Sequence, residues 1–371
     1  MIPMGSCRRC KRSAKTISGT IGFCADCIRG HFDDVWPEIK VVHDRSRRPY
    51  GLPLDPPRGE EGASCGLCMH GCKIPEGSCG FCGLRRARSG RITGGRPHEG
   101  NVSYYYDGLP TNCVASFVCP AGTGCGYPRY SVAAGPEYGY KNLAVFYEAC
   151  SFNCLYCQNY HFKERTSSLP RVHSRDLAGA VDHRTTCICY FGGDPTPQVL
   201  HALKTSRLAL KGREGGVLRI CWETNGSARW RYLEMMAALS LDSGGCIKID
   251  LKAWDNGIHR ALCGVDNRQV LENFQRLSRW TRLRPEPPLL IASTLLVPGY
   301  VDEVEVRELA SFLARLDPGI PYSLLAFHPM FFLTDLPPTS RSHALACLEA
   351  ARRAGLRRVN LGNEHLLGDY Y

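Results

Sequence analysis

From Asn142 to the end of the chain, short apolar runs alternate with stretches in which apolar residues recur every three or four positions. The runs are rich in β-branched residues, which is typical of strands buried on both faces. They cover residues 143–149, 187–193, 218–226, 246–254, 289–299, 322–329 and 358–363. This pattern predicts a buried parallel sheet.

Two of the intervening stretches have helical spacing. The first has apolar residues at Val270, Leu271, Phe274, Leu277 and Trp280, and the second at Val306, Leu309, Phe312, Leu313 and Leu316. Asp302, shortly after Gly299, is placed to cap the second helix. Strands that alternate with helices imply right-handed parallel crossovers. We therefore predict an α/β fold with a partial (β/α)6-type barrel over residues 142–371.

Cysteines set the N-terminal part apart, because the chain has 21 of them and many stand in C-x2-C pairs. The first group has the spacing C-x2-C-x13-C-x2-C and consists of Cys7, Cys10, Cys24 and Cys27. Two such pairs can surround one tetrahedral ion, so we predict a structural Zn²⁺ in a zinc-ribbon-like module over residues 1–42. A rubredoxin-like iron and free surface thiols are the alternatives. Residues 43–62, rich in Pro, Arg and Asp, read as a linker.

A second cysteine-rich segment covers residues 63–141. Its eight cysteines are Cys65, Cys68, Cys72, Cys79, Cys82, Cys113, Cys119 and Cys125. Eight thiolates suffice for two four-ligand sites. One partition joins Cys79 to Cys113, Cys119 and Cys125, and leaves the other four together. The spacing leaves zinc and an auxiliary iron–sulfur cluster both open.

Six further cysteines lie in apolar strand or helix patterns, where a free cysteine is usually a small buried hydrophobe. They are Cys187, Cys189, Cys221, Cys246, Cys263 and Cys347. We interpret most of them as core residues.

Charge and hydropathy exclude little. The 46 basic and 35 acidic residues give a formal charge of +11, which metal-bound thiolates would lower, so a nucleic acid stays an alternative partner. No run of 18 apolar residues occurs, and the first residues lack the apolar stretch of a signal peptide. We expect a cytoplasmic protein with no membrane association, whose cysteines bind metals rather than form disulfides.

Polar residues gather where the predicted strands end, and the chemistry of a β/α barrel lies at that edge. They are Cys150 after the first strand, Gly192, Gly193 and Asp194 after the second, Glu223, Thr224 and Asn225 after the third, Asp250 and Lys252 on the fourth, and His328 after the sixth. Each one alone could be a solvated loop residue or a satisfied core group. Five strand ends of this kind together indicate a site.

The loop after the first strand contains three cysteines, Cys150, Cys154 and Cys157, spaced C-x3-C-x2-C. Three thiolates can hold three irons of a [4Fe–4S] cluster and leave the fourth iron without a protein ligand. With the aromatic Tyr156 before the last cysteine, this loop resembles the radical S-adenosylmethionine (radical SAM) superfamily. The resemblance implies that the open iron binds the amine and carboxylate of S-adenosylmethionine.

Other segments extend this resemblance. "FGGDP" at 191–195 looks like the Gly-Gly-Glu-Pro segment that contacts the methionine amine, with a shorter acid at Asp194. "ETNG" at 223–226, "DLKAWDNGIHRALCGVDNRQVLEN" at 250–273, "VPGYVDE" at 297–303 and "AFHP" at 326–329 resemble glycyl-radical activating enzymes. The resemblance thus implies that Glu223, Asp250, Lys252 and His328 lie around S-adenosylmethionine.

A narrower group fits better. "CGLCMHGCKIPEGSCGFCGLR", "HPMFFLTDLPPT" and "AGLRRVNLGN" are similar to the radical SAM component of the AmmeMemoRadiSam system, a relative of pyruvate formate-lyase activating enzymes. Its front cysteines match Cys65, Cys68, Cys72 and Cys82, whereas Cys79 has no counterpart. The match covers about residues 65–90 and 142–365. Residues 1–60 and the insert near 100–140 have no counterpart in that group.

The implied activity is reductive cleavage of S-adenosylmethionine to methionine and a 5′-deoxyadenosyl radical, which abstracts hydrogen from a substrate. The electron would come from a flavodoxin- or ferredoxin-type donor. We expect a protein or peptide substrate, in glycyl-radical activation or side-chain modification. The alternatives are a small metabolite or RNA base, and a zinc-ribbon binding protein with an inactive barrel. We also expect a chain without residues 1–60 to lose zinc but keep this cleavage.

Overall fold

One large sheet organises the computed structural model, which describes residues 4–166, 171–213 and 215–371. Its eight strands run in the order β16-β15-β14-β13-β12-β11-β9-β8. They are β8 (Val102–Gly108), β9 (Lys141–Tyr147), β11 (Thr185–Gly192), β12 (Arg219–Thr224), β13 (Ile247–Asp250), β14 (Leu290–Leu296), β15 (Tyr322–Ala326) and β16 (Val359–Gly362). Strands β9 to β16 are parallel to one another, and β8 is antiparallel to β9. The predicted α/β class with a parallel sheet is confirmed.

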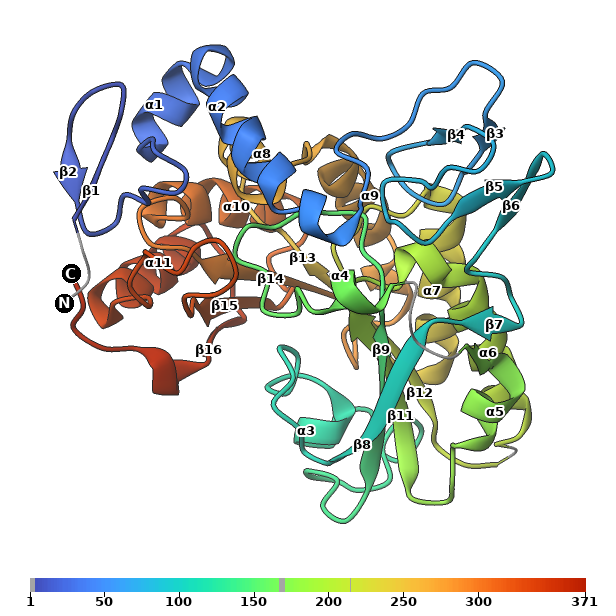
Figure 1. Cartoon of the computed structure of the whole chain (residues 1–371). Helices are drawn as coiled ribbons and strands as arrows, with labels where there is room; N and C mark the ends of the chain where they lie inside the picture. Colours follow the sequence, from blue (N-terminus) through green and yellow to red (C-terminus); the bar gives the residue numbers. More distant parts are fainter. Residues whose placement is uncertain (1–3, 167–170, 214) are drawn as a thin grey trace.

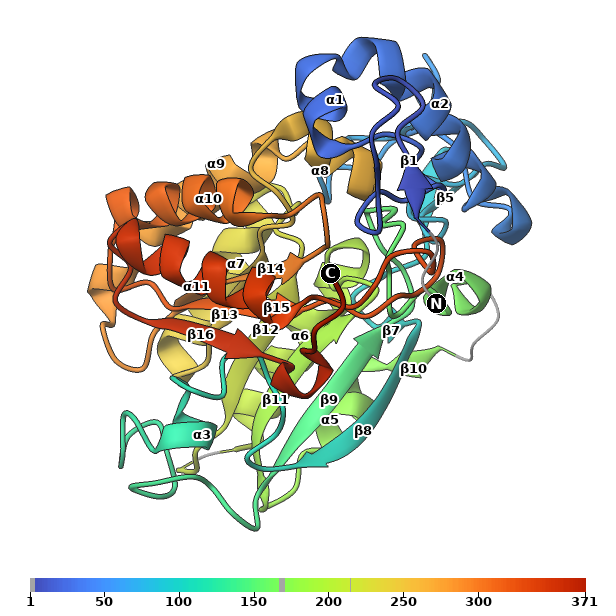
Figure 2. The same cartoon turned by 90° about the vertical axis from the view of Figure 1, so that its left-hand side faces the viewer.

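Helices return the chain between successive parallel strands, and most of them cover the outer side of the curved sheet (Figures 1 and 2). They are α4 (Phe162–Arg165), α5 (Ser174–Gly179), α6 (Val199–Lys211), α7 (Trp230–Ser243), α8 (Asn256–Cys263), α9 (Arg268–Ser278), α10 (Glu303–Leu316) and α11 (Arg341–Arg353). Single 3-10 turns are η1 (Arg48–Tyr50), η2 (Thr196–Gln198), η3 (Thr281–Leu283) and η4 (Glu364–Leu366). The predicted cap of α10 is confirmed, because Asp302 accepts hydrogen bonds from the amides of Val304 and Glu305.

The two faces of the central strands differ in chemistry. Tyr190 on β11 and Trp222 on β12 stack with ring centroids 4.7 Å apart, and Trp222 Nε1 donates to Met236 O of α7 at 3.2 Å. These positions therefore face the helices. Because side chains alternate along a strand, the neighbouring Cys189 and Cys221 face the inside of the barrel.

The barrel is partial, because within the described residues β8 and β16 are the two edges of the sheet and pair with no further strand. Strand β8 belongs to the segment that was predicted as separate from the barrel, so the sheet begins before residue 142. Its side chains at Tyr104, Tyr105 and Tyr106 are exposed.

The N-terminal module consists of β1 (Gly5–Ser6), β2 (Ser13–Ala14), α1 (Ala25–Gly30) and α2 (Phe32–Arg45). It packs on the barrel: Tyr300 donates to Phe23 O at 2.9 Å, and Arg29 pairs with the buried Glu305 at 3.0 Å. The expected linker at 43–62 begins inside α2, and Arg47 in it is buried. This stretch is thus part of the packed structure rather than a free spacer.

The cysteine-rich segment splits into two parts at opposite ends of the molecule (Figures 1 and 2). One part has the short strands β3 (Ala63–Ser64), β4 (Lys73–Ile74), β5 (Arg86–Arg88), β6 (Arg91–Thr93) and β7 (Glu99–Gly100), the last paired with β10 (Val172–His173). The other is the insert at residues 109–140, which contains α3 (Pro120–Thr123). Among the described residues, no helix has the length and apolar character to cross a membrane.

Candidate functional site

The three cysteines of the C-x3-C-x2-C loop face a cavity of about 210 Å³ at the carboxyl ends of the strands. The cavity brings together nearly all the side chains predicted from the strand ends. Its lining includes Cys150, Cys154, Tyr156, Cys157, Gly192, Gly193, Asp194, Glu223, Thr224, Asn225, Asp250 and Lys252. His328 is not among the lining residues, and its side chain is exposed directly after β15.

Backbone hydrogen bonds hold the cysteine loop against the end of α8. The amide of Asn153 donates to Cys263 O at 3.0 Å, and that of Leu155 donates to Leu262 O at 2.9 Å. From the other side, the Asn153 amide group meets His43 Nδ1 at 3.1 Å and donates to Ser46 Oγ at 2.9 Å. The N-terminal module therefore supports the loop directly.

Two buried cations lie next to these thiols, and the sequence did not single them out. Lys163 donates to Asn153 Oδ1 at 2.6 Å, and burial lowers its pKa to about 8 although the nearby cysteines raise it. Arg47 is buried and lies near Cys150 and Cys82. In the absence of a metal, burial raises the pKa of Cys157 to about 12. A bound metal would favour the thiolates, whose charge these cations offset.

The Gly-Gly-Asp turn fits tightly against the end of β9. A Cβ at Gly193 would lie 2.4 Å from Ala149 O, and Gly192 has a φ of +111°, so both positions require glycine. The buried Asp194 carboxylate accepts from the Thr196 amide at 2.8 Å, from Thr224 Oγ1 at 3.0 Å and from the Asn225 amide at 2.7 Å. Its role here is to tie β11 to β12, which leaves the turn's backbone for a ligand.

Charged groups also line this cavity. Asp250 pairs with Lys252 at 2.6 Å and accepts from Ser293 Oγ at 2.5 Å. Burial alone would lower the pKa of Lys252, but Asp250 raises it well above its ordinary value. An acid and a base held side by side can bind a zwitterionic ligand through both of its charges.

Two smaller features complete the cavity. Tyr156 is buried, with its hydroxyl 3.6 Å from Cys263 Sγ, and Asn225 Nδ2 lies 3.7 Å from Cys150 Sγ. Asn363 also lines the cavity and has a left-handed backbone, φ 57°. Sequence reasoning missed Asn363, although it lies in the quoted "RRVNLGN" run.

The residues present fit a [4Fe–4S] cluster and S-adenosylmethionine. One loop supplies three thiols and no fourth cysteine, buried cations stand behind them, and the cavity in front ends in an acid–base pair. Such a donor set can hold a cluster with one open iron.

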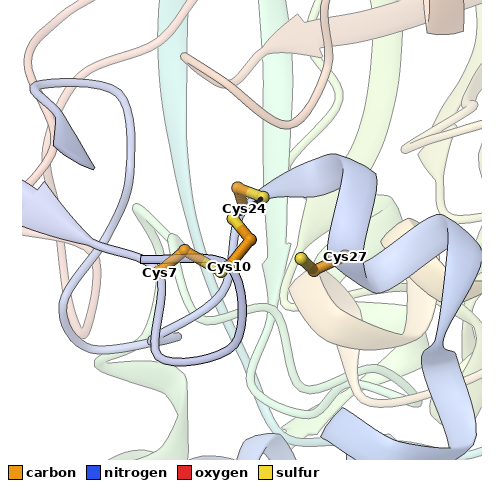
Figure 3. Close-up of side chains that lie close together, drawn as sticks. All are labelled: Cys7, Cys10, Cys24 and Cys27. Carbon is orange, nitrogen blue, oxygen red and sulfur yellow. Dashed lines mark hydrogen bonds between the residues drawn. The ribbon is translucent and has the colours of Figure 1, made fainter. Parts of the chain in front are cut away.

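The N-terminal cysteines form a compact group (Figure 3). The sulfurs of Cys7, Cys10, Cys24 and Cys27 all lie within 4.8 Å of one another, and those of Cys10 and Cys24 are 3.7 Å apart. Zn–S bonds of about 2.3 Å in a tetrahedron place sulfurs about 3.8 Å apart. The group is therefore compact enough to hold one metal ion.

The other cysteines are arranged only partly as the sequence suggested. Cys65, Cys68, Cys72 and Cys82 lie near one another, since Cys68 lies within electrostatic range of the other three. The backbone of Cys79 pairs with that of Arg86, the first residue of β5. Strand β5 lies far from α3 of the insert that carries Cys113, Cys119 and Cys125 (Figure 1). The partition that joined Cys79 to these three is therefore wrong, because the chain between them crosses from one end of the barrel to the other.

Comparisons with known proteins agree with this site. Residues 144–313 match the family model described as the radical SAM superfamily. The matched residues are thus a radical SAM domain, and the match supports the general radical SAM reaction.

Two curated proteins of Methanocaldococcus jannaschii are similar to this chain. An uncharacterized protein of Methanocaldococcus jannaschii is 27% identical over 311 residues, which are 81% of this chain and 80% of the relative. A second protein of that organism, provisionally named a glycyl-radical enzyme activating enzyme, is 28% identical over 48% of this chain and 64% of its own length. Among solved structures, a domain of pyruvate-formate lyase-activating enzyme from Bacteroides vulgatus matches 47% of this chain and 98% of that domain, with 22% identity and a TM-score of 0.37.

Proposed function

We propose that this chain cleaves S-adenosylmethionine reductively to a 5′-deoxyadenosyl radical and directs it at a protein or peptide substrate. One observation carries the proposal. Cys150, Cys154 and Cys157 share a cavity with the Asp250–Lys252 pair, so a cluster and a zwitterionic methionine moiety have adjacent binding groups.

When bound, the cluster supplies a single electron and a Lewis-acidic iron for the amine and carboxylate of S-adenosylmethionine. Cys150, Cys154 and Cys157 would hold it, and Lys163 and Arg47 would offset its negative charge. Gly192, Gly193 and Asp194 with Thr224 and Asn225 would form the floor under the methionine. Glu223, Asp250, Lys252 and Tyr156 line the same cavity and would surround the rest of the molecule, whereas His328 lies outside this lining.

A large substrate is favoured by the open side of the barrel. Strand β8 is an edge of the sheet, and Tyr104, Tyr105 and Tyr106 on it are exposed. An extended peptide can pair with such an edge, while aromatic side chains give it apolar contacts. One relative's provisional name, glycyl-radical enzyme activating enzyme, points to the same substrate class.

The N-terminal parts are proposed to serve this reaction. Residues 1–42 would hold one structural Zn²⁺, and a metal at Cys65, Cys68, Cys72 and Cys82 would lie near the cysteine loop, because Arg47 lies near both Cys82 and Cys150. An iron–sulfur centre there would suit electron entry from a flavodoxin- or ferredoxin-type donor.

The decisive experiment is anaerobic reconstitution with iron and sulfide, followed by reduction in the presence of S-adenosylmethionine. The wild type is expected to produce 5′-deoxyadenosine, and Cys150→Ala, Cys154→Ala and Cys157→Ala are expected to produce none. Cys347→Ala, a buried cysteine of α11, is the matched control. Production in any of the three loop variants would contradict the assignment. No production by the wild type would favour the zinc-ribbon binding protein with an inactive barrel.

A protein substrate is tested separately, since a small metabolite or an RNA base could use the same radical. Reactions are run with a deuterated peptide library and, in parallel, with a deuterated metabolite mixture and tRNA. Deuterium in the 5′-deoxyadenosine is expected only from the peptides. Transfer from metabolites or RNA alone would replace this substrate class and leave the cleavage reaction intact.

A further inference from the structure

A second cavity, of about 150 Å³, lies inside the barrel near the amino-terminal ends of the strands. Six cysteines line it: Cys113, Cys119, Cys187, Cys189, Cys221 and Cys246. The sequence suggested that the last four are separate core residues. Their strands instead bring them together on the inner face, since Cys189 on β11 is directly beside Cys221 on β12.

The insert at 109–140 closes this cavity from below. Cys113 and Cys119 of the insert pack into the same small core as Cys221 and Cys246 of the strands. The sulfurs of Cys221 and Cys246 are 4.0 Å apart, and Cys246 O accepts from the Trp222 amide at 2.9 Å. Four thiols from two separate parts of the chain thus converge on one space.

A buried ammonium stands among these sulfurs. The Lys248 side chain is 2% exposed, and its Nζ lies 3.2 Å from Cys113 Sγ, 3.1 Å from Cys189 Sγ and 2.7 Å from Glu223 Oε1. The guanidinium of Arg219 also lines the cavity. Glu223 pairs with Lys248 at 2.7 Å and Glu137 pairs with Arg219 at 2.6 Å, and metal-bound thiolates would place further negative charge beside these cations.

The spacing favours a cluster over a single ion. The N-terminal cysteines are preformed for one ion, with every ligand sulfur within 4.8 Å of the others. The interior cysteines are spread around a cavity of about 150 Å³, a size that admits a benzene-sized guest. Thiolates select zinc, copper(I) and iron–sulfur clusters, and a cluster is the one of these that fills such a space.

We infer that Cys113, Cys119, Cys221 and Cys246 bind an iron–sulfur cluster inside the barrel. Phe191 and Glu223 line this cavity and also the cavity of the cysteine loop. The second cluster therefore borders the reaction cavity from the side opposite the first. Because its ligands are separate from Cys150, Cys154 and Cys157, it does not depend on cleavage of S-adenosylmethionine.

The test uses the full chain with Cys150, Cys154 and Cys157 changed to Ala, so that the loop cluster is absent from every sample. Iron and sulfide are measured after anaerobic reconstitution with ⁵⁷Fe, together with Mössbauer spectra. Adding Cys221→Ala and Cys246→Ala is expected to remove about two irons for a [2Fe–2S] cluster or about four for a [4Fe–4S] cluster. Any iron at Cys65 to Cys82 is common to all samples and cancels in the difference.

A second double variant, Cys113→Ala with Cys119→Ala, changes the two half-buried cysteines of the insert and is less disruptive to the core. Circular dichroism checks that both double variants are folded. The second double variant is expected to remove the same iron. Cys187→Ala, which lines the cavity but is outside the four, should leave the iron content unchanged. Iron that persists in both double variants, or loss of zinc in place of iron, would overturn the proposal.

Discussion

Asp250 and Lys252 illustrate how single residues define the reaction cavity. Their charged groups are 2.6 Å apart and both line the cavity. We expect Asp250→Ala and Lys252→Ala to weaken S-adenosylmethionine binding by about tenfold to a hundredfold, the cost of losing a hydrogen bond to a charged group. Calorimetric titration of the reconstituted protein measures this. Iron content should stay at the wild-type value. If both variants bind S-adenosylmethionine with wild-type affinity, the pair takes no part in binding.

Lys163 makes a different prediction, because it is a buried cation beside the cysteine loop. Removing a positive charge near a metal cluster disfavours its more negative, reduced form. Lys163→Met is therefore expected to lower the midpoint potential of the loop cluster by on the order of 60 mV, which is a tenfold change for one electron. Redox titration followed by electron paramagnetic resonance measures it. The exposed Lys211→Met is the control and should leave the potential unchanged.

Between elements, an ion pair helps to fasten the insert to the barrel. Glu137 accepts from Arg219 at 2.7 and 2.6 Å and from Thr186 Oγ1 at 2.7 Å, and its side chain is fully buried. Glu137→Ala leaves Arg219 buried and unpaired, so we expect a loss of about 3–5 kcal/mol in the free energy of unfolding. Urea denaturation measures it. Glu286→Ala, in an exposed pair with Arg358, should cost no more than about 1 kcal/mol.

The same ion pair gives a pH dependence. Burial alone would raise the pKa of Glu137, but the hydrogen bonds from Arg219 hold it below its ordinary value. A depressed carboxyl pKa contributes stability above the unfolded value of about 4.3, and this is lost as the pH falls through the folded value. Wild type should therefore lose stability below about pH 4 more steeply than Glu137→Gln. If the free energy of unfolding falls equally steeply with pH in the two proteins, this assignment is contradicted.

Contacts between α2 and the cysteine loop change what removal of the N-terminal module should do. The sequence suggested that a chain without residues 1–60 keeps its activity, yet His43 and Ser46 hold Asn153 between the loop cysteines. Losing such supporting residues typically costs about tenfold or more in metal affinity. We now expect the truncated chain to lose loop-cluster iron as well as zinc. The His43→Ala, Ser46→Ala double variant should lose iron and keep its zinc. If the truncated chain and the double variant both keep full iron, the truncation is again expected to spare the cleavage of S-adenosylmethionine.

For the whole molecule, much could be predicted from local pattern. Strand runs such as 322–329 and the cap at Asp302 depend on neighbouring residues, so the barrel and its strand-end residues followed from the sequence. The contacts of Lys163 and Arg47 with the loop arise from distant segments, which no local spacing reveals. The interior cysteines had a usable signal: Cys187, Cys189 and Phe191 alternate along one strand, as do Cys221 with Glu223 and Cys246 with Lys248. The sequence analysis interpreted most of these cysteines as separate core residues, although the alternation places Cys187, Cys189, Cys221 and Cys246 on one inner face.

The Glu137–Arg219 anchor has a consequence for the order in which the protein is assembled. The insert closes the interior cavity from below, so a cluster bound there must enter before that anchor forms or while it is open. The chain would then mature in sequence, with loading of the interior cavity first and closure of the insert second. Protein folded without iron would be trapped in a closed, empty form that later addition of iron fills slowly. Cells that make this protein would need cluster delivery matched to its folding.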